Sequence, residues 1–248
     1  MNPAAASPGA SRPSATGAGS GAVGILGGSF DPVHRGHLAL AQAARAALGL
    51  EQVRLMPAAQ PWQKGALAAS AADRAHLIEL ALGEQPGLVL DMHEIARGGP
   101  SYTIDTLREL RAALGPATPL VLIVGGDQFD RLDTWREWQA LTEHAHLAVA
   151  QRAGAALTPA AAVQAWALPR RAAPAAALRR PAGAVIEFAM PPVPVSATAL
   201  RAALAAPPTP EGEAQLRAAL GPAVLDYIRA HHLYRNPHGH QETAAHDR

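Results

Sequence analysis

The chain has 248 residues, of which 49% are hydrophobic but only 4% aromatic, so alanine supplies much of the apolar content. It carries 21 basic and 20 acidic side chains, and the formal charge of +1 favours neither nucleic acid nor an acidic membrane as a partner. The absence of cysteine excludes disulfides, thiolate catalysis and cysteine-ligated metal sites. No run of about 18 apolar residues is present, so we expect a cytoplasmic protein without a membrane-spanning helix.

Composition divides the chain into three parts. Residues 1–21 are mostly Ala, Ser, Gly and Pro and predict a disordered leader, and the polar residues 236–248 predict a disordered tail. The intervening residues, 22–235, are predicted to form a single domain. Within it, residues 153–183 are rich in Ala, Pro and Arg and stand out as a variable segment whose arginines we expect to be solvated.

Strands and helices are predicted to alternate through this domain. In chain order, hydrophobic spacing predicts strand 22–26, helix 36–48, strand 53–56, helix 71–82, strand 88–90, helix 103–114, strand 120–124, helix 135–143, strand 147–150, helix 158–166, strand 185–188, and helices 196–204 and 221–232. Such alternation indicates an α/β fold, a doubly wound parallel sheet with helices on both faces. A C-terminal helical segment follows the last strand.

The segment 27–37, GGSFDPVHRGH, joins the first strand to the first helix, where open parallel sheets bind ligands. Its glycines permit close approach of a bulky anion, and the helix N-terminus adds free N–H groups and a positive dipole end. His34 and His37 lie three residues apart and can face the same phosphate. A capping or core pair is the plainer alternative, and a zinc site lacks a nearby third ligand.

These residues resemble the signature of adenylyltransferases with a Rossmann-like nucleotidyl-transferase fold. The segment 194–201, PVSATALR, is similar to the second motif of that superfamily, a Ser/Thr-rich turn before a basic residue. Further segments resemble bacterial nicotinate-nucleotide adenylyltransferases: PAAQPWQK at 57–64, GPSYTIDTL at 99–107, GGD at 125–127 and LDTW at 132–135. The resemblance spans about 23–234.

The resemblance implies adenylyl transfer from ATP to nicotinate mononucleotide, which gives deamido-NAD and pyrophosphate in NAD biosynthesis. His34 and His37 would be the catalytic residues, stabilising charge at the α-phosphate without a covalent intermediate. The implied ATP and phosphate ligands are Gly27, Gly28, Ser29, Phe30, Lys64, Ser196, Thr198 and Arg201. At residue 197 the family usually has a second Ser or Thr, and this chain has Ala197. Ser196 also suits plain helix capping.

The implied ligands of nicotinate mononucleotide are Ser101, Tyr102, Thr103, Asp127 and Trp135. The start of the predicted helix 103–114 would bind the nicotinate carboxylate, with an ordinary helix cap at Thr103 as the alternative. The Trp135 ring would stack on the pyridinium, and packing in the core is its alternative. Mg²⁺ would arrive with ATP, held by phosphates and water and not by a protein metal site. The sequence indicates no oligomeric state.

Two other functions fit the shared motif. Pantetheine-phosphate adenylyltransferase has the same histidine loop, but the chain length and the segments 101–107 and 132–135 disfavour it. A non-catalytic nucleotide sensor on the same fold would lose its phosphate-handling residues, and this chain retains them.

Overall fold

The computed structural model describes residues 21–62, 65–152 and 156–235. The predicted tail, the predicted leader up to residue 20, and Lys64 therefore lie outside the described residues. Within the described ranges, no helix is long and apolar enough to cross a membrane.

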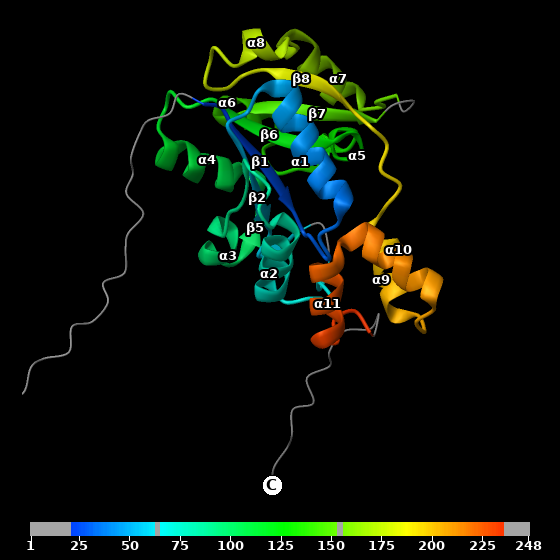
Figure 1. Ribbon diagram of the computed structural model, residues 1–248. Helices are drawn as coiled ribbons and strands as arrows, with labels where there is room; N and C mark the ends of the chain where they lie inside the picture. The colour runs from blue at the N-terminus through cyan, green and yellow to red at the C-terminus, as the bar shows by residue number, and fades with distance from the viewer. Residues whose placement is uncertain (1–20, 63–64, 153–155, 236–248) are drawn as a thin grey trace, which may run out of the picture.

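A six-stranded parallel sheet forms the centre of the molecule (Figure 1). Its strands are β1 (Val23–Gly28), β2 (Gln52–Pro57), β4 (Leu88–Leu90), β6 (Leu120–Gly125), β7 (His146–Arg152) and β8 (Val185–Met190), in the order β4-β2-β1-β6-β7-β8. Every pairing is parallel. The predicted doubly wound α/β fold is thereby confirmed. A second, two-stranded sheet joins β3 (Gln60–Pro61) to β5 (Pro100–Ser101).

Alternation along the strands gives the sheet two apolar faces. Leu26, Val53 and Ile123 belong to one buried cluster, whereas their neighbours in the strands, such as Ile25 and Leu122, belong to another. Because successive side chains of a strand point to opposite faces, each face needs its own layer of helices. The run of apolar residues in β6 is buried on both sides for this reason.

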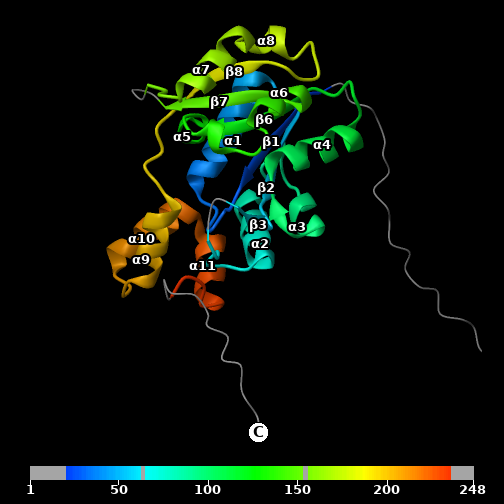
Figure 2. The same cartoon turned by 180° about the vertical axis from the view of Figure 1, so that it is seen from behind.

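Helices cover both faces of the sheet (Figures 1 and 2). The first cluster includes residues of α1 (Arg35–Leu48), α2 (Ala71–Leu82), α8 (Pro174–Ala177), α9 (Ala197–Ala205), α10 (Pro210–Leu220) and α11 (Pro222–Ala230). The second cluster includes residues of α4 (Thr103–Leu114), α5 (Gly126–Phe129), α6 (Leu141–His144) and α7 (Ala161–Ala167). The short α3 (His93–Arg97) follows β4. In both views α9, α10 and α11 gather at one end of the molecule, away from α7 and α8.

The sheet order reverses between β1 and β6. From β1 the chain adds β2 and then β4 on one side, and β6, β7 and β8 on the other. In an open α/β sheet the crevice at such a reversal, beyond the carboxyl ends of the strands, is where ligands bind. The loop after β1 and the short helix α5 after β6 therefore border the expected site.

The predicted helix over 135–143 is wrong. Trp135 has an extended backbone, with ψ 144°, and Glu137 has a left-handed φ of 49°. These two residues interrupt the helix, and the segment instead contains 3-10 turns at Leu132–Thr134 and Trp138–Ala140, followed by α6. The sequence prediction also missed α10, which begins at Pro210 after the capping residue Thr209.

The Ala/Pro/Arg-rich stretch forms the crossover from β7 to β8. Its helix α7 buries Val163 and Trp166, and a 3-10 turn at Leu168–Arg170 leads on to α8. Arg170 differs from the predicted solvated arginine, because its guanidinium lies 5.0 Å from the Trp166 ring centroid and donates to the Trp166 carbonyl. We infer that α7 and α8 help to cover the two faces of the sheet, one on each face.

Candidate active site

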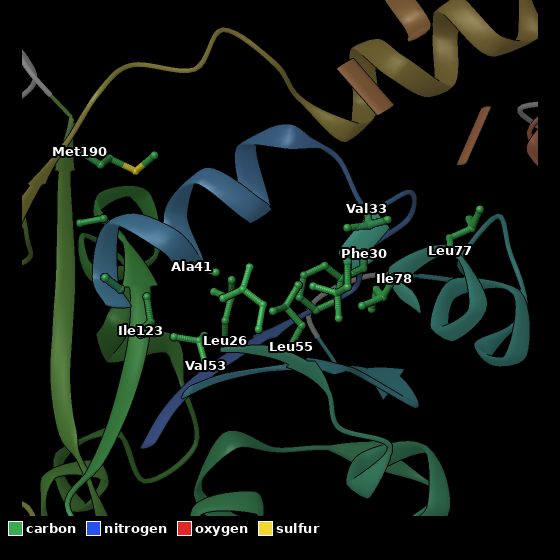
Figure 3. Packing of buried hydrophobic residues seen from close by; sticks show 14 of the residues in the cluster. Leu26, Phe30, Val33, Ala41, Val53, Leu55, Leu77, Ile78, Ile123 and Met190 are labelled. Atoms are coloured by element: carbon green, nitrogen blue, oxygen red, sulfur yellow. The ribbon is translucent and has the colours of Figure 1, made fainter. Parts of the chain in front are cut away.

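The loop between β1 and α1 has an unusual backbone at Phe30. This residue has φ 47°, a left-handed value that is uncommon outside glycine, and its side chain is fully buried. The ring packs edge-on against His37 at 4.8 Å, and Figure 3 shows Phe30 and Val33 beside Ile78 of α2. Because strained backbone persists only where its surroundings hold it, this loop has a defined shape.

Asp31 fixes the neighbouring loop. Its carboxylate is buried and accepts hydrogen bonds from the backbone N–H groups of Ala68 (2.9 Å) and Ala69 (3.1 Å). The structure thus supports a role for Asp31 in positioning the loop. The segment that leads into α2 is thus tied to the loop after β1.

His34 and His37 cap the start of α1 reciprocally. Nδ1 of His34 accepts from the Gly36 N–H at 3.2 Å, and Nδ1 of His37 accepts from the His34 N–H at 3.2 Å. Their rings stack with centroids 3.8 Å apart. A Cβ at Gly36 would lie 3.0 Å from both the His34 ring and Val195, so glycine avoids two tight contacts at this position. The capping alternative is therefore observed, and anion binding by the pair stays a prediction.

This capping sets the tautomer of both rings. A ring nitrogen that accepts a hydrogen bond carries no proton, so each neutral ring carries its hydrogen on Nε2. Burial lowers the pKa of His34 to about 4, so its ring is neutral near pH 7. His34 can thus present a donor from Nε2 at a helix N-terminus, which is the chemistry needed to bind phosphate.

The second motif contacts the first directly. Ser196 caps α9 through a hydrogen bond from the Ala199 N–H at 3.2 Å. Arg201 donates through Nη1 to the Asp31 carbonyl at 2.7 Å and through Nη2 to the Thr198 hydroxyl at 3.4 Å. Residues about 170 positions apart in the chain therefore form one edge of the site.

The predicted nicotinate residues 101–103 precede and begin α4. Tyr102, and not Thr103, is the N-cap of α4, and no described side chain caps this end. The Ser101 hydroxyl is buried and accepts from the Ala59 N–H at 2.9 Å, so it fixes the loop after β2. The Tyr102 ring lies 6.1 Å from the Trp62 ring and 4.8 Å from the Arg136 guanidinium. The alternative of a helix cap at Thr103 is therefore wrong, because the start of α4 carries no side-chain cap among the described residues.

Asp127 and Trp135 both follow β6 but differ in burial. Asp127 is exposed in the first turn of α5 and accepts from the Gln128 side chain at 3.0 Å. Trp135 packs against the second core cluster, and its buried Nε1 has no hydrogen-bond partner among the described residues. For Trp135, the alternative of core packing is therefore observed for part of the indole.

A cavity of about 500 Å³ opens between the loop after β2 and the start of α4. Trp62, Arg74 and Tyr102 are among its lining residues. Within the described ranges, no group of three or more His, Asp or Glu side chains could hold a metal ion. The cavity has room for a small organic ligand and lies beside the uncapped start of α4.

Sequence reasoning missed Arg74. This side chain is 1% exposed, lies on the same face of α2 as Leu77 and Ile78, and donates to the Ser29 carbonyl at 2.8 Å. The signal was available, because Arg74 occupies an apolar position three and four residues before Leu77 and Ile78. Trp62 and Arg136 beside Tyr102 were also not singled out.

Comparison with known proteins places the chain among nucleotidyltransferases. The family model described as cytidylyltransferase-like matches residues 25–203. A relative from Laribacter hongkongensis, named probable nicotinate-nucleotide adenylyltransferase, is 46% identical over 218 residues, which are 87% of this chain and 95% of the relative. A Chromobacterium violaceum protein of the same name is 43% identical over 86% of this chain and 98% of its own length.

A solved structure adds support for the fold. Plasmodium falciparum nicotinic acid mononucleotide adenylyltransferase complexed with NaAD matches 86% of this chain and 97% of its own, with a TM-score of 0.66 and 15% identity. The fold agrees, and the family follows from the sequence matches. The chain belongs to the cytidylyltransferase-like family, in its nicotinate-nucleotide adenylyltransferase branch.

Proposed function

We propose that this protein transfers the adenylyl group of ATP to nicotinate mononucleotide, giving nicotinate adenine dinucleotide and pyrophosphate. The observation that carries the proposal is the reciprocal cap of His34 and His37 at the switch point of the sheet. It holds both rings at the start of α1 with Nδ1 bonded to the backbone, which leaves Nε2 as the donor nitrogen of each ring. The names of the close relatives support the same reaction.

In this reaction the mononucleotide phosphate attacks the α-phosphorus of ATP, a new P–O bond forms, and pyrophosphate leaves with the electrons of the broken bond. His34 and His37 would donate to the oxygens on which charge develops, so catalysis is electrostatic and positional. Gly27, Gly28, Ser29 and Phe30 would line the phosphates through the backbone. Ser196, Thr198 and Arg201 would bind the β- and γ-phosphates, together with Lys64.

We assign magnesium to ATP as part of the substrate. Mg²⁺ keeps several waters and commonly binds through substrate phosphates, so the reaction does not need a protein cage of carboxylates. The absence of a metal cluster among the described residues is compatible with this assignment.

We assign the second substrate to the uncapped start of α4. The first N–H groups of this helix have no side-chain cap among the described residues, and the helix dipole favours an anion there. Tyr102, Thr103 and Ser101 would surround the nicotinate carboxylate, Trp135 would contact the ring and Asp127 a ribose hydroxyl. A carboxamide would turn an NH₂ donor toward N–H donors and lose the charge-assisted bonds.

The test is a coupled assay of pyrophosphate release with Mg-ATP and three acceptors: nicotinate mononucleotide, its amide analogue and phosphopantetheine. We expect kcat/KM for the acid to exceed that for the amide by at least roughly tenfold, because an unpaired buried polar group costs about 1 to 3 kcal/mol. Thr103→Val should narrow this ratio and leave the KM for ATP unchanged. Preference for phosphopantetheine, or no turnover with any acceptor, would refute the proposal.

A further inference from the structure

Arg74 of α2 is a buried cation that contacts the loop between β1 and α1. Its Nη1 donates to the Ser29 carbonyl at 2.8 Å, and its Nη2 lies 3.5 Å from the Ala59 carbonyl. Ser29 follows β1 and Ala59 follows β2, so one guanidinium joins the loops after two neighbouring strands. Through its own N–H, Ala59 continues this connection to Ser101 before α4.

The bond to Ser29 determines where the next N–H points. Among the described residues only the Asp31–Pro32 peptide is cis, so the peptide between Ser29 and Phe30 is trans. In a trans peptide the C=O and the N–H point in opposite directions. Since Arg74 holds the Ser29 carbonyl toward α2, the Phe30 N–H is directed to the other side of the loop.

Stability alone does not account for an arginine at this position. Its Nε is buried and has no hydrogen-bond partner among the described residues. Burial lowers the pKa of Arg74, while the nearby Asp31 carboxylate opposes that shift. An apolar side chain on this face of α2 would avoid the desolvation of a charge, which costs several kcal/mol before compensation. The guanidinium is therefore explained better by the shape it gives to the loop.

We propose that Arg74 is a positioning residue that, by holding the Ser29 carbonyl, directs the Phe30 N–H toward a substrate phosphate. This inference rests on the proposed function, because it assigns the Phe30 N–H to phosphate binding. Arg74 itself does not touch the reacting atoms in this account. Removal of the Arg74 side chain should misdirect the Phe30 N–H without removing any group that contacts substrate.

The experiment compares Arg74→Lys and Arg74→Met with the matched control Arg111→Met. Arg111 also lies on a helix and donates to main-chain carbonyls, those of Gly115, Thr118, His144 and Pro181. We expect Arg74→Met to lower kcat/KM for ATP roughly 100-fold, the effect of a misplacement of about 1 Å, and Arg74→Lys to recover part of it. Arg111→Met should lower the Tm and leave kcat/KM unchanged.

A second measurement separates this inference from the proposed function. Inorganic pyrophosphate is titrated into ¹⁵N-labelled wild type and Arg74→Lys, and the amide signal of Phe30 is followed. We expect a shift in the wild type that is at least halved in the variant, whether or not nicotinate mononucleotide is turned over. An Arg74 variant with lowered Tm but unchanged kcat/KM and an unchanged Phe30 response would overturn the inference. The inference would also be overturned if pyrophosphate did not shift the Phe30 amide signal of the wild type. This result can be obtained even if no variant folds.

Discussion

The two ends of the central sheet contain the same two residue types, arginine and histidine, in different hydrogen-bonding arrangements. At the amino end, Arg111 donates to four carbonyls that precede strands or follow α4, and His146 uses both ring nitrogens for the backbone. At the carboxyl end, Arg74 holds the loops after β1 and β2, and His34 caps α1 through Nδ1. At each end, therefore, an arginine and a buried histidine are bound to main chain.

The difference lies in what remains for a ligand. Nδ1 of His146 accepts from the Ala184 N–H at 3.1 Å and Nε2 lies 2.9 Å from the Arg180 carbonyl, so the ring has no remaining polar atom. Nε2 of His34 has no hydrogen-bond partner among the described residues. At the amino end both nitrogens of His146 are bonded, whereas at the carboxyl end Nε2 of His34 is left unbonded among the described residues. The comparison teaches that a buried histidine is a candidate ligand-binding residue only when one of its ring nitrogens has no hydrogen-bond partner within the protein.

The largest effect should follow from removing a donor at the carboxyl end. In His37→Asn, the side-chain oxygen can still accept from the His34 N–H, but no donor occupies the place of Nε2. We expect kcat to fall roughly 10²–10³-fold, as on loss of one oriented transition-state donor, with little change in Tm.

His37→Gln is the matched control for that variant. Its amide N–H can reach the place of Nε2 but cannot preserve the cap, so we expect a smaller loss of kcat and a stability loss of about 1 kcal/mol. Steady-state kinetics and thermal unfolding of both variants distinguish the two roles. Equal kcat in His37→Asn and wild type would show that His37 only caps α1.

A smaller effect concerns pH. Burial lowers the pKa of His34 to about 4 and also lowers the pKa of His146, so both are neutral in the folded protein and bind protons more readily when unfolded. The free energy of unfolding should therefore decrease as the pH falls below 6.5, by about 3 kcal/mol for His34 down to its folded pKa of about 4, and His146 should add to the decrease in the same direction.

Denaturant unfolding at several pH values checks this prediction with one variant from each end. Both His34→Asn and His146→Gln should flatten the pH dependence, because a titrating group is removed. At neutral pH, only His34→Asn should lower kcat. A pH dependence that neither variant changes would contradict the buried neutral state of the two rings.

The sheet and most helices were predictable from the sequence because strand runs and helical spacing were both clear. The helix predicted over 135–143 is wrong because Glu137 has a left-handed backbone, which no residue pattern predicts. The omission of α10 was avoidable, since Thr209 and Pro210 form a helix start and Gly221 a stop.

At the site, sequence analysis named candidate residues but not how they contact one another. The bond from Arg201 to Asp31 and the reciprocal cap of His34 and His37 depend on backbone geometry that spacing cannot supply. Arg74 was missed because an arginine in a helix is usually solvated, although its apolar register indicated burial. The carbonyls that it holds belong to loops distant in sequence.

The central claim is that the histidine pair stabilises charge on phosphate and never bonds to phosphorus. The most direct measurement is the stereochemical course at the α-phosphorus, with a chiral α-thio-ATP as donor and nicotinate mononucleotide as acceptor. A single in-line displacement inverts the configuration, and this account predicts inversion. Retention would require two displacements through a covalent adenylyl-enzyme and would contradict it.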